Sequence, residues 1–479
     1  MPWRKTIAVV LLALAAGGGS EVPRASGATF RGDGWLVRYN IPDQDTAVTN
    51  CSPDEYVLRE AWLERIDALQ KGDWAAMASY TLGGADSRTG AAGPMLKAVS
   101  NALARGAKVG WVVGSGVNTN TAYNGYTLAS LGKMSKNPLR LKKAPKDNGI
   151  MHDKMGVFSY AGQVPWVLTG SWNFTGGASS LQWNALVEIQ DMALANAYSN
   201  ELSQLLAGKF HGNAGKSHAW DGATFRLPGW TRDGWVRFAP YPDGAYGGNN
   251  ALTDITNAIA NAREDIFFAL NNLSRRNIAE ALIGACDRGV NVYGTVMWAD
   301  WATPDDGSYE CVHMLLDGTR YATTNRAHIL MAYTAGDKSE ADGGQQDLVH
   351  VKYAVIDPWG ESPLLIQGSA NWTEAGLVAT NRNDDNIEFI PDAAMAQAFV
   401  AQYLAMTDGP QPVLTSIRRD ADGVWSLDYR YGADRVLEQS PTLGPEAQWT
   451  PVALPPDPAG GTIVLEGAPP SMFFRLHGD

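Results

Sequence analysis

His152-Asp153-Lys154 and Gly170-Ser171-Trp172-Asn173 decide the fold of this chain, because the same two frames return as His350-Val351-Lys352 and Gly368-Ser369-Ala370-Asn371. Each residue of the second copy follows its counterpart by the same interval, 350 − 152 = 198 for the histidines. The whole chain contains only seven histidines, so two of them in matched frames indicate an internal duplication. A single His-x-Lys tripeptide is far more often a structural histidine near a strand end, and the repeat in phase reverses that interpretation.

Composition places the chain among ordinary globular proteins. With 479 residues, 45% hydrophobic and 18% charged, it is long enough for two or three domains with ample cores. A net charge of −12 argues against broad nucleic-acid binding, since phosphates repel an acidic surface. One cluster before His152 is basic, and it is interpreted either as a solvated loop or as a phosphate-attracting rim. Its members are Lys133, Lys136, Arg140, Lys142, Lys143 and Lys146.

The first residues have the layout of an export signal. Arg4 and Lys5 precede an apolar run over 7–16, and small residues follow. Such a run is too short to span a bilayer, so residues 1–27 are predicted to be a cleaved signal peptide, with an uncleaved anchor as the alternative. No other stretch is long and apolar enough to cross a membrane. The mature protein is therefore expected to be soluble and secreted or periplasmic.

Cysteine usage adds little. Three cysteines allow one disulfide at most, and Cys286 with Cys311, which fall in the same predicted lobe, form the favoured pair. Their spacing matches no zinc or iron–sulfur pattern, so metal ligation by cysteine is set aside.

The two halves repeat one order of helices and strands. Helical spacing and glycine stops predict helices, and apolar β-rich runs predict strands between them. The first half gives helix 56–69, strand 74–82, helix 94–105 and strand 108–113. The second half gives helix 252–263, strand 265–270, helix 277–288 and strand 291–297.

Two more strands accompany each motif. Strands 155–158 and 166–169, like strands 353–356 and 364–367, are joined by short connections and should be antiparallel neighbours. Strands alternating with helices indicate α/β layers with mixed sheets. The sequence thus predicts two α/β lobes, over 28–225 and 226–411. The remaining 412–479, with short alternating segments between Pro- and Gly-rich turns, predicts a small antiparallel β-sandwich-like accessory module.

These motifs resemble the phospholipase D superfamily. The resemblance rests on the two His-x-Lys frames, each followed by Gly-Ser-x-Asn, and covers about residues 30–408. It implies two pseudo-symmetric α/β lobes that share one active site at their interface, with one motif from each lobe. It also implies that the site needs no metal and no other cofactor.

The resemblance assigns a role to each motif residue. A phosphodiester resists attack until the charge on its oxygens is neutralised, which Lys154 and Lys352 would do. One histidine attacks phosphorus while the other protonates the leaving alcohol, and family analogy favours His152 as nucleophile and His350 as acid and base. The substrate phosphate would be held by Ser171, Asn173, Ser369 and Asn371.

The two copies are unequal in their supporting residues. In the second half, Asp385 matches the family carboxylate that orients the motif histidine, and Asp357 matches a structural aspartate. The first half has Ser159 in place of that aspartate, and its stretch Gln182-Trp183-Asn184 lacks a carboxylate. Asn184 or Glu188 is expected to orient His152 instead. The first half is therefore predicted to be the degenerate copy.

Residues outside the motifs bear less on function. His211 and His218 lie in a Gly-rich connector and are expected at the surface rather than on a metal. Four tryptophans near predicted strand ends are expected either to meet a lipid headgroup interface or to pack in the core. They are Trp298, Trp301, Trp359 and Trp372.

Export, acidity and 17 tryptophans favour a phospholipid substrate such as phosphatidylcholine, hydrolysed or transferred through a phosphohistidine. The protein would meet this substrate at a membrane or vesicle surface, as a monomer. A secreted metal-independent endonuclease is the alternative. The second alternative is a non-catalytic phosphate-binding protein that retains the fold, which Ser159 and Trp183 would favour.

Overall fold

A computed structural model describes most of the chain and divides it into two compact units. One unit is Ala25–Thr407, and the other comprises Met1–Arg24 with Asp408–Asp479. The described residues of the first unit are 29–42, 53–83, 90–211, 223–241, 247–297, 307–316, 329–331 and 348–407. In the second unit they are 413–419, 425–430, 435–440, 450–451, 461–465 and 473–478. The expected signal peptide lies outside the described residues.

The first lobe is built on an eight-stranded sheet with the order β1-β2-β9-β7-β6-β3-β4-β5. Its strands are β1 (Thr29–Gly32), β2 (Trp35–Tyr39), β3 (Trp74–Ser79), β4 (Lys108–Val113), β5 (Arg140–Lys143), β6 (Lys154–Ser159), β7 (Trp166–Gly170) and β9 (Ala185–Gln190). The second lobe has the matching order β10-β11-β18-β17-β16-β12-β13-β14. Its strands are β10 (Ala223–Phe225), β11 (Gly234–Phe238), β12 (Asp265–Leu270), β13 (Asn291–Val296), β14 (Ile329–Met331), β16 (Lys352–Ile356), β17 (Leu364–Gly368) and β18 (Asn386–Ile390).

The two sheets also agree in strand direction. The β3-β4-β5 and β12-β13-β14 edges are parallel, and the remaining neighbours in both sheets are antiparallel. The predicted mixed sheets and motif hairpins β6–β7 and β16–β17 are confirmed. Strands β4 and β12 have the predicted bounds, whereas β3 ends at Ser79, before the predicted end.

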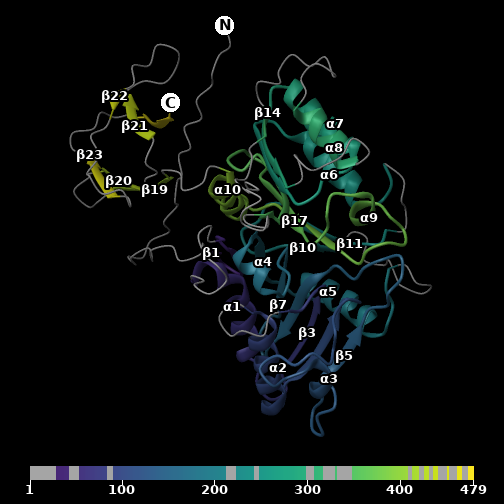
Figure 1. Cartoon of the computed structure of the whole chain (residues 1–479). Helices are drawn as coiled ribbons and strands as arrows, with labels where there is room; N and C mark the ends of the chain where they lie inside the picture. Colours follow the sequence, from purple (N-terminus) through teal and green to yellow (C-terminus); the bar gives the residue numbers. More distant parts are fainter. Residues whose placement is uncertain are drawn as a thin grey trace, which may run out of the picture. The chain divides into compact units, whose positions relative to one another are not determined.

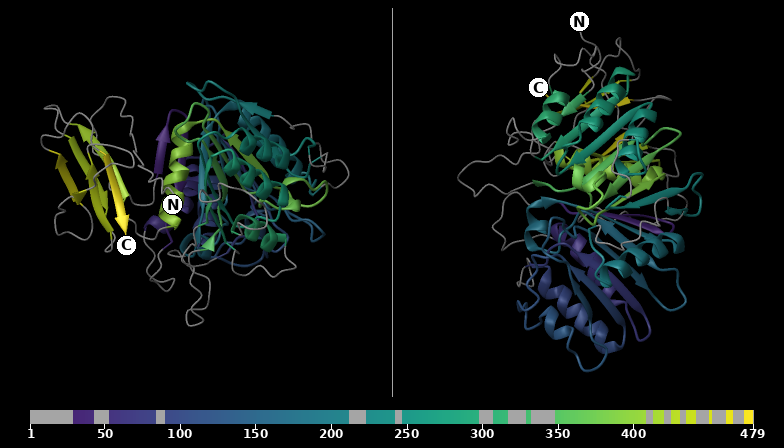
Figure 2. Two further views of the ribbon diagram at one scale, coloured as in Figure 1. Left: turned by 90° about the horizontal axis from the view of Figure 1, so that it is seen from above. Right: turned by 90° about the vertical axis from the view of Figure 1, so that its right-hand side faces the viewer.

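Helices cover both faces of each sheet (Figures 1 and 2). The first lobe has α1 (Pro53–Asp67), α2 (Ala92–Arg105), α3 (Leu128–Leu131), α4 (Gly176–Ser180) and α5 (Met192–Leu206). The second lobe has α6 (Ala251–Asn261), α7 (Arg276–Asp287), α8 (Gly307–Leu316), α9 (Glu374–Leu377) and α10 (Ala393–Thr407). The helix α2 ends at the predicted glycine, since Gly106 takes the left-handed conformation (φ 98°) and its N–H bonds Ala102 and Leu103 carbonyls.

The lobes share one hydrophobic core in addition to their own. Tyr198 and Leu202 of α5 and Phe399 and Tyr403 of α10 belong to one buried cluster that also includes residues of both sheets. A separate cluster lies under α1 and α2, and another under α6 and α7. Because the shared core joins both lobes, their facing surfaces are held together as one body.

The C-terminal strands form two small antiparallel sheets, as predicted for this region. One contains β19 (Val413–Arg419), β20 (Trp425–Arg430) and β23 (Gly461–Leu465). The other contains β22 (Thr450–Pro451), β21 (Arg435–Ser440) and β24 (Phe473–Gly478). The segments expected to be strands here are 425–431, 436–439, 463–465 and 472–476, so neither β19 nor β22 is predicted.

The favoured disulfide is absent. Cys286 on α7 and Cys311 on α8 are both buried free thiols in the core of the second lobe. That prediction is wrong because each sulfur packs as a small apolar group between neighbouring helices. Among the described residues, the helices are all too short or too polar to cross a bilayer.

Candidate active site

Each motif histidine is held by backbone of the opposite lobe. The short strand β15 (Leu348–Val349) runs parallel to β8 (Gln182–Trp183), and the His350 N–H donates to the Trp183 carbonyl at 3.0 Å. In the same way, the His152 N–H donates to the Asp384 carbonyl at 2.8 Å. The chain before each histidine therefore pairs with the chain before the orienting residue of the other lobe.

His152 is oriented by Asp385 from the second lobe. Its Nδ1 lies 2.7 Å from Asp385 Oδ1, and both side chains are buried. Burial alone would raise the pKa of Asp385, but His152, Lys154 and the Ser369 hydroxyl outweigh it and hold that pKa below its usual value. A carboxylate can only accept, so Nδ1 carries the proton and Nε2 keeps its lone pair toward the site.

His350 is oriented by Asn184 from the first lobe. Its Nδ1 lies 2.8 Å from Asn184 Oδ1. The amide orientation follows from its other bonds, because Asn184 Nδ2 donates to the Ala178 carbonyl at 2.8 Å. Nδ1 of His350 is therefore also the protonated nitrogen. Both histidines are therefore protonated on Nδ1. The partner of His152 is the charged Asp385 carboxylate, and the partner of His350 is the neutral Asn184 amide.

This crossed arrangement corrects the sequence analysis, which placed each orienting residue with the histidine of its own half. Asp385 orients His152, and Asn184 orients His350. The carboxylate of the intact second copy thus serves the histidine of the degenerate first copy. The physical reason is that the lobes meet edge to edge at the β8–β15 and 151–384 pairings.

The motif serines hold the orienting residues. Ser171 Oγ donates to Asn184 Oδ1 at 2.8 Å, and Ser369 Oγ donates to Asp385 Oδ1 at 2.7 Å. Each hydroxyl also accepts a backbone N–H, from Ala185 and Asn386 respectively. Each hydroxyl has a single proton, and that proton is already donated to the orienting residue. It is therefore not available to the substrate phosphate, which was the predicted role of both serines.

The amides of Asn173 and Asn371 remain available for a ligand. They follow β7 and β17, and no hydrogen bond joins either side chain to another described residue. Their predicted role as phosphate donors stays a prediction.

Burial disfavours the charged forms of all four basic side chains of the two motifs. Burial, reinforced by Lys154, lowers the pKa of His152 to about 4, and burial lowers the pKa of Lys154 to about 7. Desolvation and the neighbouring Lys352 and Lys154 hold the pKa of His350 well below its usual value. The pKa of Lys352 is depressed by burial and by Lys154. The motifs therefore act on one another within one site, and a bound anion would raise these pKa values by stabilising the charged forms.

The remaining supporting residues have structural roles. Asp357 accepts the backbone N–H groups of Arg263, Glu264 and Asp265 at 2.8 to 3.2 Å, at the far end of β16. In the first lobe, where Ser159 stands instead, Asp73 accepts from the Gln70 and Ala161 N–H groups.

Glu188 was predicted to help orient His152, and this is wrong. It is fully buried on β9, where it forms ion pairs with Arg38 at 2.8 Å and Arg65 at 2.7 Å. Its strand position directs it to the α1 side of the sheet, where both arginines compensate its charge.

Sequence reasoning missed two contacts of the site. Tyr80, directly after β3, has its ring centroid 5.0 Å from that of His152 and 5.2 Å from Lys154 Nζ. His211 is buried, not at the surface as predicted, and its Nδ1 lies 2.8 Å from Asp384 Oδ2. No local pattern marked Tyr80, because the predicted strand over 74–82 placed it inside the strand rather than at its end. His218 lies outside the described residues.

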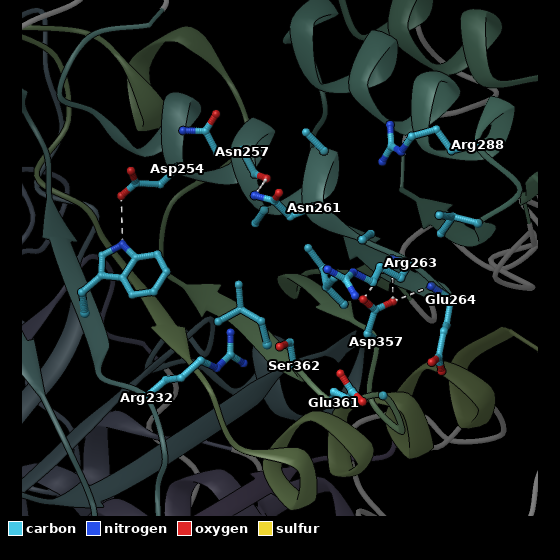
Figure 3. A pocket seen from close by; sticks show the side chains of 18 residues that line it. Arg232, Asp254, Asn257, Asn261, Arg263, Glu264, Arg288, Asp357, Glu361 and Ser362 are labelled. Atoms are coloured by element: carbon cyan, nitrogen blue, oxygen red, sulfur yellow. Dashed lines mark hydrogen bonds between the residues drawn. The ribbon is translucent and has the colours of Figure 1, made fainter.

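A pocket of about 1150 Å³ in the second lobe lies away from this site (Figure 3). It is lined by α6, the β16–β17 hairpin and Asp357, at the end of β16 opposite Lys352. Neither motif histidine lines this pocket. The hydrogen-bonded histidines and buried lysines, rather than this cavity, therefore mark the candidate active site.

Of the two alternatives for the four tryptophans, core packing is confirmed for Trp372. Trp372 is fully buried, so it cannot meet a lipid interface, and Trp359 is partly exposed on the β16–β17 hairpin, at the far end of β16. Trp298 and Trp301 lie outside the described residues. Within the described ranges, no group of three or more His, Cys, Asp or Glu residues is placed to hold a metal ion.

Comparison with known protein families decides the assignment. The family model described as "Cardiolipin synthase, PLD-like domain" matches residues 73–206 and 255–407, more than half of the chain. The protein is a member of the phospholipase D superfamily. The match falls on both lobes and places the chain among phosphodiesterase-type enzymes. Among curated proteins, none matches the sequence.

The chain is similar to several solved structures at low sequence identity. Phosphatidylserine synthase of Haemophilus influenzae Rd KW20 is 11% identical with a TM-score of 0.52, over 74% of this chain and 85% of that chain. Polyphosphate kinase of Porphyromonas gingivalis is 13% identical with a TM-score of 0.46, over 77% of this chain and 49% of that one. Nuc of Salmonella typhimurium, a phospholipase D family member, is 19% identical with a TM-score of 0.27, over 36% and 93%. This phospholipase D superfamily member therefore spans about half the length of the polyphosphate kinase.

Proposed function

We propose that this protein hydrolyses phospholipid headgroups, phosphatidylcholine among them, through a phosphohistidine intermediate. The observation that carries the proposal is the matched pair of histidines, His152 and His350, each with Nδ1 held by a residue of the opposite lobe. Two oriented imidazoles beside two buried lysines are the groups that an in-line displacement at phosphorus requires.

The roles of the two histidines follow from their partners. Attack by His152 Nε2 forms a bond to phosphorus as the bond to the leaving alcohol oxygen breaks, and the ring becomes cationic. The Asp385 carboxylate stabilises that positive charge for as long as the intermediate exists. His350, which keeps some contact with solvent, acts as the imidazolium and donates its second ring proton, on Nε2, to the leaving oxygen. The neutral His350 then removes a proton from water, whose oxygen bonds to phosphorus as the P–N bond to His152 breaks, so that phosphatidic acid leaves and the nucleophile is free.

The lipid substrate is supported by the family model and by the composition. The matching family is described by a lipid synthase, and the fold is shared with a phosphatidylserine synthase. The net charge of −12 disfavours polynucleotides as general partners. We also infer that the protein is exported, which the apolar run at 7–16 supports. The basic cluster before His152 is the observation that favours the alternative, a secreted metal-independent endonuclease.

One experiment tests the proposal. The purified protein, with and without EDTA, is incubated with phosphatidylcholine vesicles and with plasmid DNA, beside His152→Ala and His350→Ala variants. We expect choline release that EDTA does not affect and that either substitution lowers at least about 10³-fold. DNA nicking without choline release would establish the endonuclease, and inactivity on both substrates would establish a binding protein.

A second measurement separates the two histidines. A phosphodiester with a 4-nitrophenol leaving group needs little acid assistance, because the departing phenolate is already stable. His350→Ala should therefore still accumulate a phosphohistidine from it, whereas His152→Ala should not. Trapping of phosphate on His350 in the His152→Ala variant would reverse the assignment.

A further inference from the structure

One end of the first lobe has a charge opposite to that of the whole protein. Residues 87–146 contain ten of the chain's 38 basic residues and none of its 50 acidic residues. The basic residues are Arg88, Lys97, Arg105, Lys108, Lys133, Lys136, Arg140, Lys142, Lys143 and Lys146. This stretch forms α2, β4, α3 and β5, and Figure 1 shows α2 and α3 together at the lower end of the first lobe.

The densest part of this stretch is β5 and its flanks, here called the basic edge. It consists of Lys133, Lys136, Arg140, Lys142, Lys143 and Lys146, which are exposed except for the half-buried Lys142. Among the residues that the structure describes, no carboxylate forms an ion pair with any of them. Unpaired cations on an edge strand keep their full attraction for an external anion.

The basic edge is held in place by hydrogen bonds from the Asn137 side-chain amide and from the backbone. Asn137, in the turn before β5, donates to the Leu103 and Ala107 carbonyls at the end of α2, and Leu139 N–H donates to the Leu131 carbonyl. β5 itself pairs with β4 over its whole length. The lysines therefore project from a fixed strand.

The register of the sheet places the basic edge beside the active site. Lys143 pairs with Val113, Val113 with Ser79, and Ser79 with Lys154. Neighbouring strands are about 4.8 Å apart, so the Lys143 backbone lies roughly 14 Å from that of Lys154, at the catalytic end of the sheet. The chain after Lys146 leads directly to His152. Arg382 of the second lobe, which donates to the Asn148 carbonyl, adds another cation there.

The second lobe lacks such an edge. Its equivalent segment from α7 to β14 contains four basic and seven acidic residues, against eight and none from α2 to β5. The described part of the second-lobe segment has two arginines and three carboxylates, so it offers a polynucleotide no matching run of cations. A flat anionic surface can bind a protein through a single cationic edge, because each lysine near the surface adds to the binding free energy independently.

We propose that the basic edge docks the protein on an anionic phospholipid bilayer and brings the site between the lobes to the lipid headgroups. This inference rests on the proposed phospholipid substrate. It assigns the lipid around the substrate, not the substrate, as the partner of Lys142, Lys143 and Lys146. The acidic remainder of the protein would be repelled by the same surface, which fixes the orientation of the molecule.

Vesicle binding tests the proposal without catalysis. The full-length His152→Ala protein is sedimented with vesicles of phosphatidylcholine alone or of two parts phosphatidylcholine and one part phosphatidylglycerol. We expect binding to the anionic vesicles that weakens with added salt. Replacing Lys142, Lys143 and Lys146 by Gln together should lower the affinity about 100-fold at low salt. The matched control replaces Arg232, Arg263 and Arg288 of the second-lobe pocket by Gln and should bind as the parent does.

The outcomes distinguish a failure of the docking proposal from a failure of the proposed phospholipid activity. Equal binding to both vesicle types, or an equal loss in both triple variants, would overturn the docking surface. If the parent binds DNA but not vesicles, and the lysine variant loses that DNA binding, the partner is a nucleic acid and the docking proposal is overturned. Wild-type protein that releases choline from detergent-dispersed lipid but ignores vesicles would refute docking and leave the activity standing. With catalytic protein, the lysine variant should lose activity on anionic vesicles relative to activity on a soluble phosphodiester, at an unchanged melting temperature.

Discussion

The first and second lobes have the same strand order and strand directions but differ in the side chains that support the chemistry. At the position that orients a histidine, the first lobe has Asn184 and the second has Asp385. At the far end of the motif strand, the first has Ser159 and the second Asp357. Since each orienting residue reaches into the other lobe, a change in one lobe alters the histidine of its neighbour. Duplication thus preserved the backbone while the two histidines became chemically distinct.

The facing surfaces of the lobes differ as well. Asn386 accepts from Thr169 Oγ1 and donates to Asp153 Oδ1, each at 2.8 Å, and so joins the lobes. Its counterpart in the first lobe is Ala185, and the counterpart of the buried Glu388 is Val187. One side of the interface is therefore a polar network, and the related side is apolar.

The largest effect is expected from Asp385→Asn. The amide keeps the shape of the side chain but removes the charge that stabilises a cationic His152, and it can present its NH₂ group to Nδ1 and force the wrong tautomer. We expect kcat to fall at least about 10²-fold. Steady-state turnover and the yield of trapped phosphohistidine measure this. Asp392→Asn, in the same lobe but outside the site, is the matched control. Activity equal to that control would remove Asp385 from the mechanism.

The next effect concerns stability and Glu388. Burial raises the pKa of Glu388 to about 7, so the folded state holds its proton more tightly than the unfolded state. At low pH the Glu388 carboxyl is neutral in both the folded and the unfolded state, and the free energy of unfolding is highest. As pH rises from about 4.5 through 7, the unfolded state releases the proton first, so the free energy of unfolding falls. The shift corresponds to roughly 3 kcal/mol. Chemical denaturation from pH 5 to pH 8 should show this decline in wild type and a smaller one in Glu388→Gln. Parallel pH dependences in the two proteins would contradict the assignment.

A smaller effect is expected from His211→Ala. His211 holds the Asp384 carboxylate through its backbone N–H at 2.9 Å and its ring at 2.8 Å, and the Asp384 backbone holds His152. It is a positioning residue, so we expect about a tenfold lower kcat with little change in KM. A double-mutant cycle with Asp385→Asn separates this role from a purely structural one. Additive losses would mean that His211 does not act through the His152–Asp385 pair.

The smallest effect is expected from Asn184→Asp, which makes the two lobes alike. A carboxylate beside His350 favours the imidazolium, so the pKa of His350 should rise by about 1 unit. The alkaline limb of the kcat profile, where the general acid loses its proton, should move to higher pH by that amount. Asn120→Asp adds the same charge at an exposed position of the first lobe and should leave the limb in place. A shift of the limb to lower pH would mean that His350 is not the acid.

The sequence by itself determined the duplication, the α/β class, the two mixed sheets and the four motif residues with a histidine or lysine. These follow from local patterns: the motif frames repeat in register, and helix and strand periodicity gives β4 and β12 their observed bounds. The antiparallel C-terminal strands followed from the same local reasoning, although β19 and β22 were missed.

Only the tertiary structure decided which residue supports which histidine. The His152–Asp385 contact spans 233 residues and the His350–Asn184 contact spans 166, so neither leaves a trace in local periodicity. The same holds for Glu188, whose partners Arg38 and Arg65 come from other elements, and for the burial of His211. Strand alternation fixes which residues share a face, but the packing of one lobe against the other decides what that face meets.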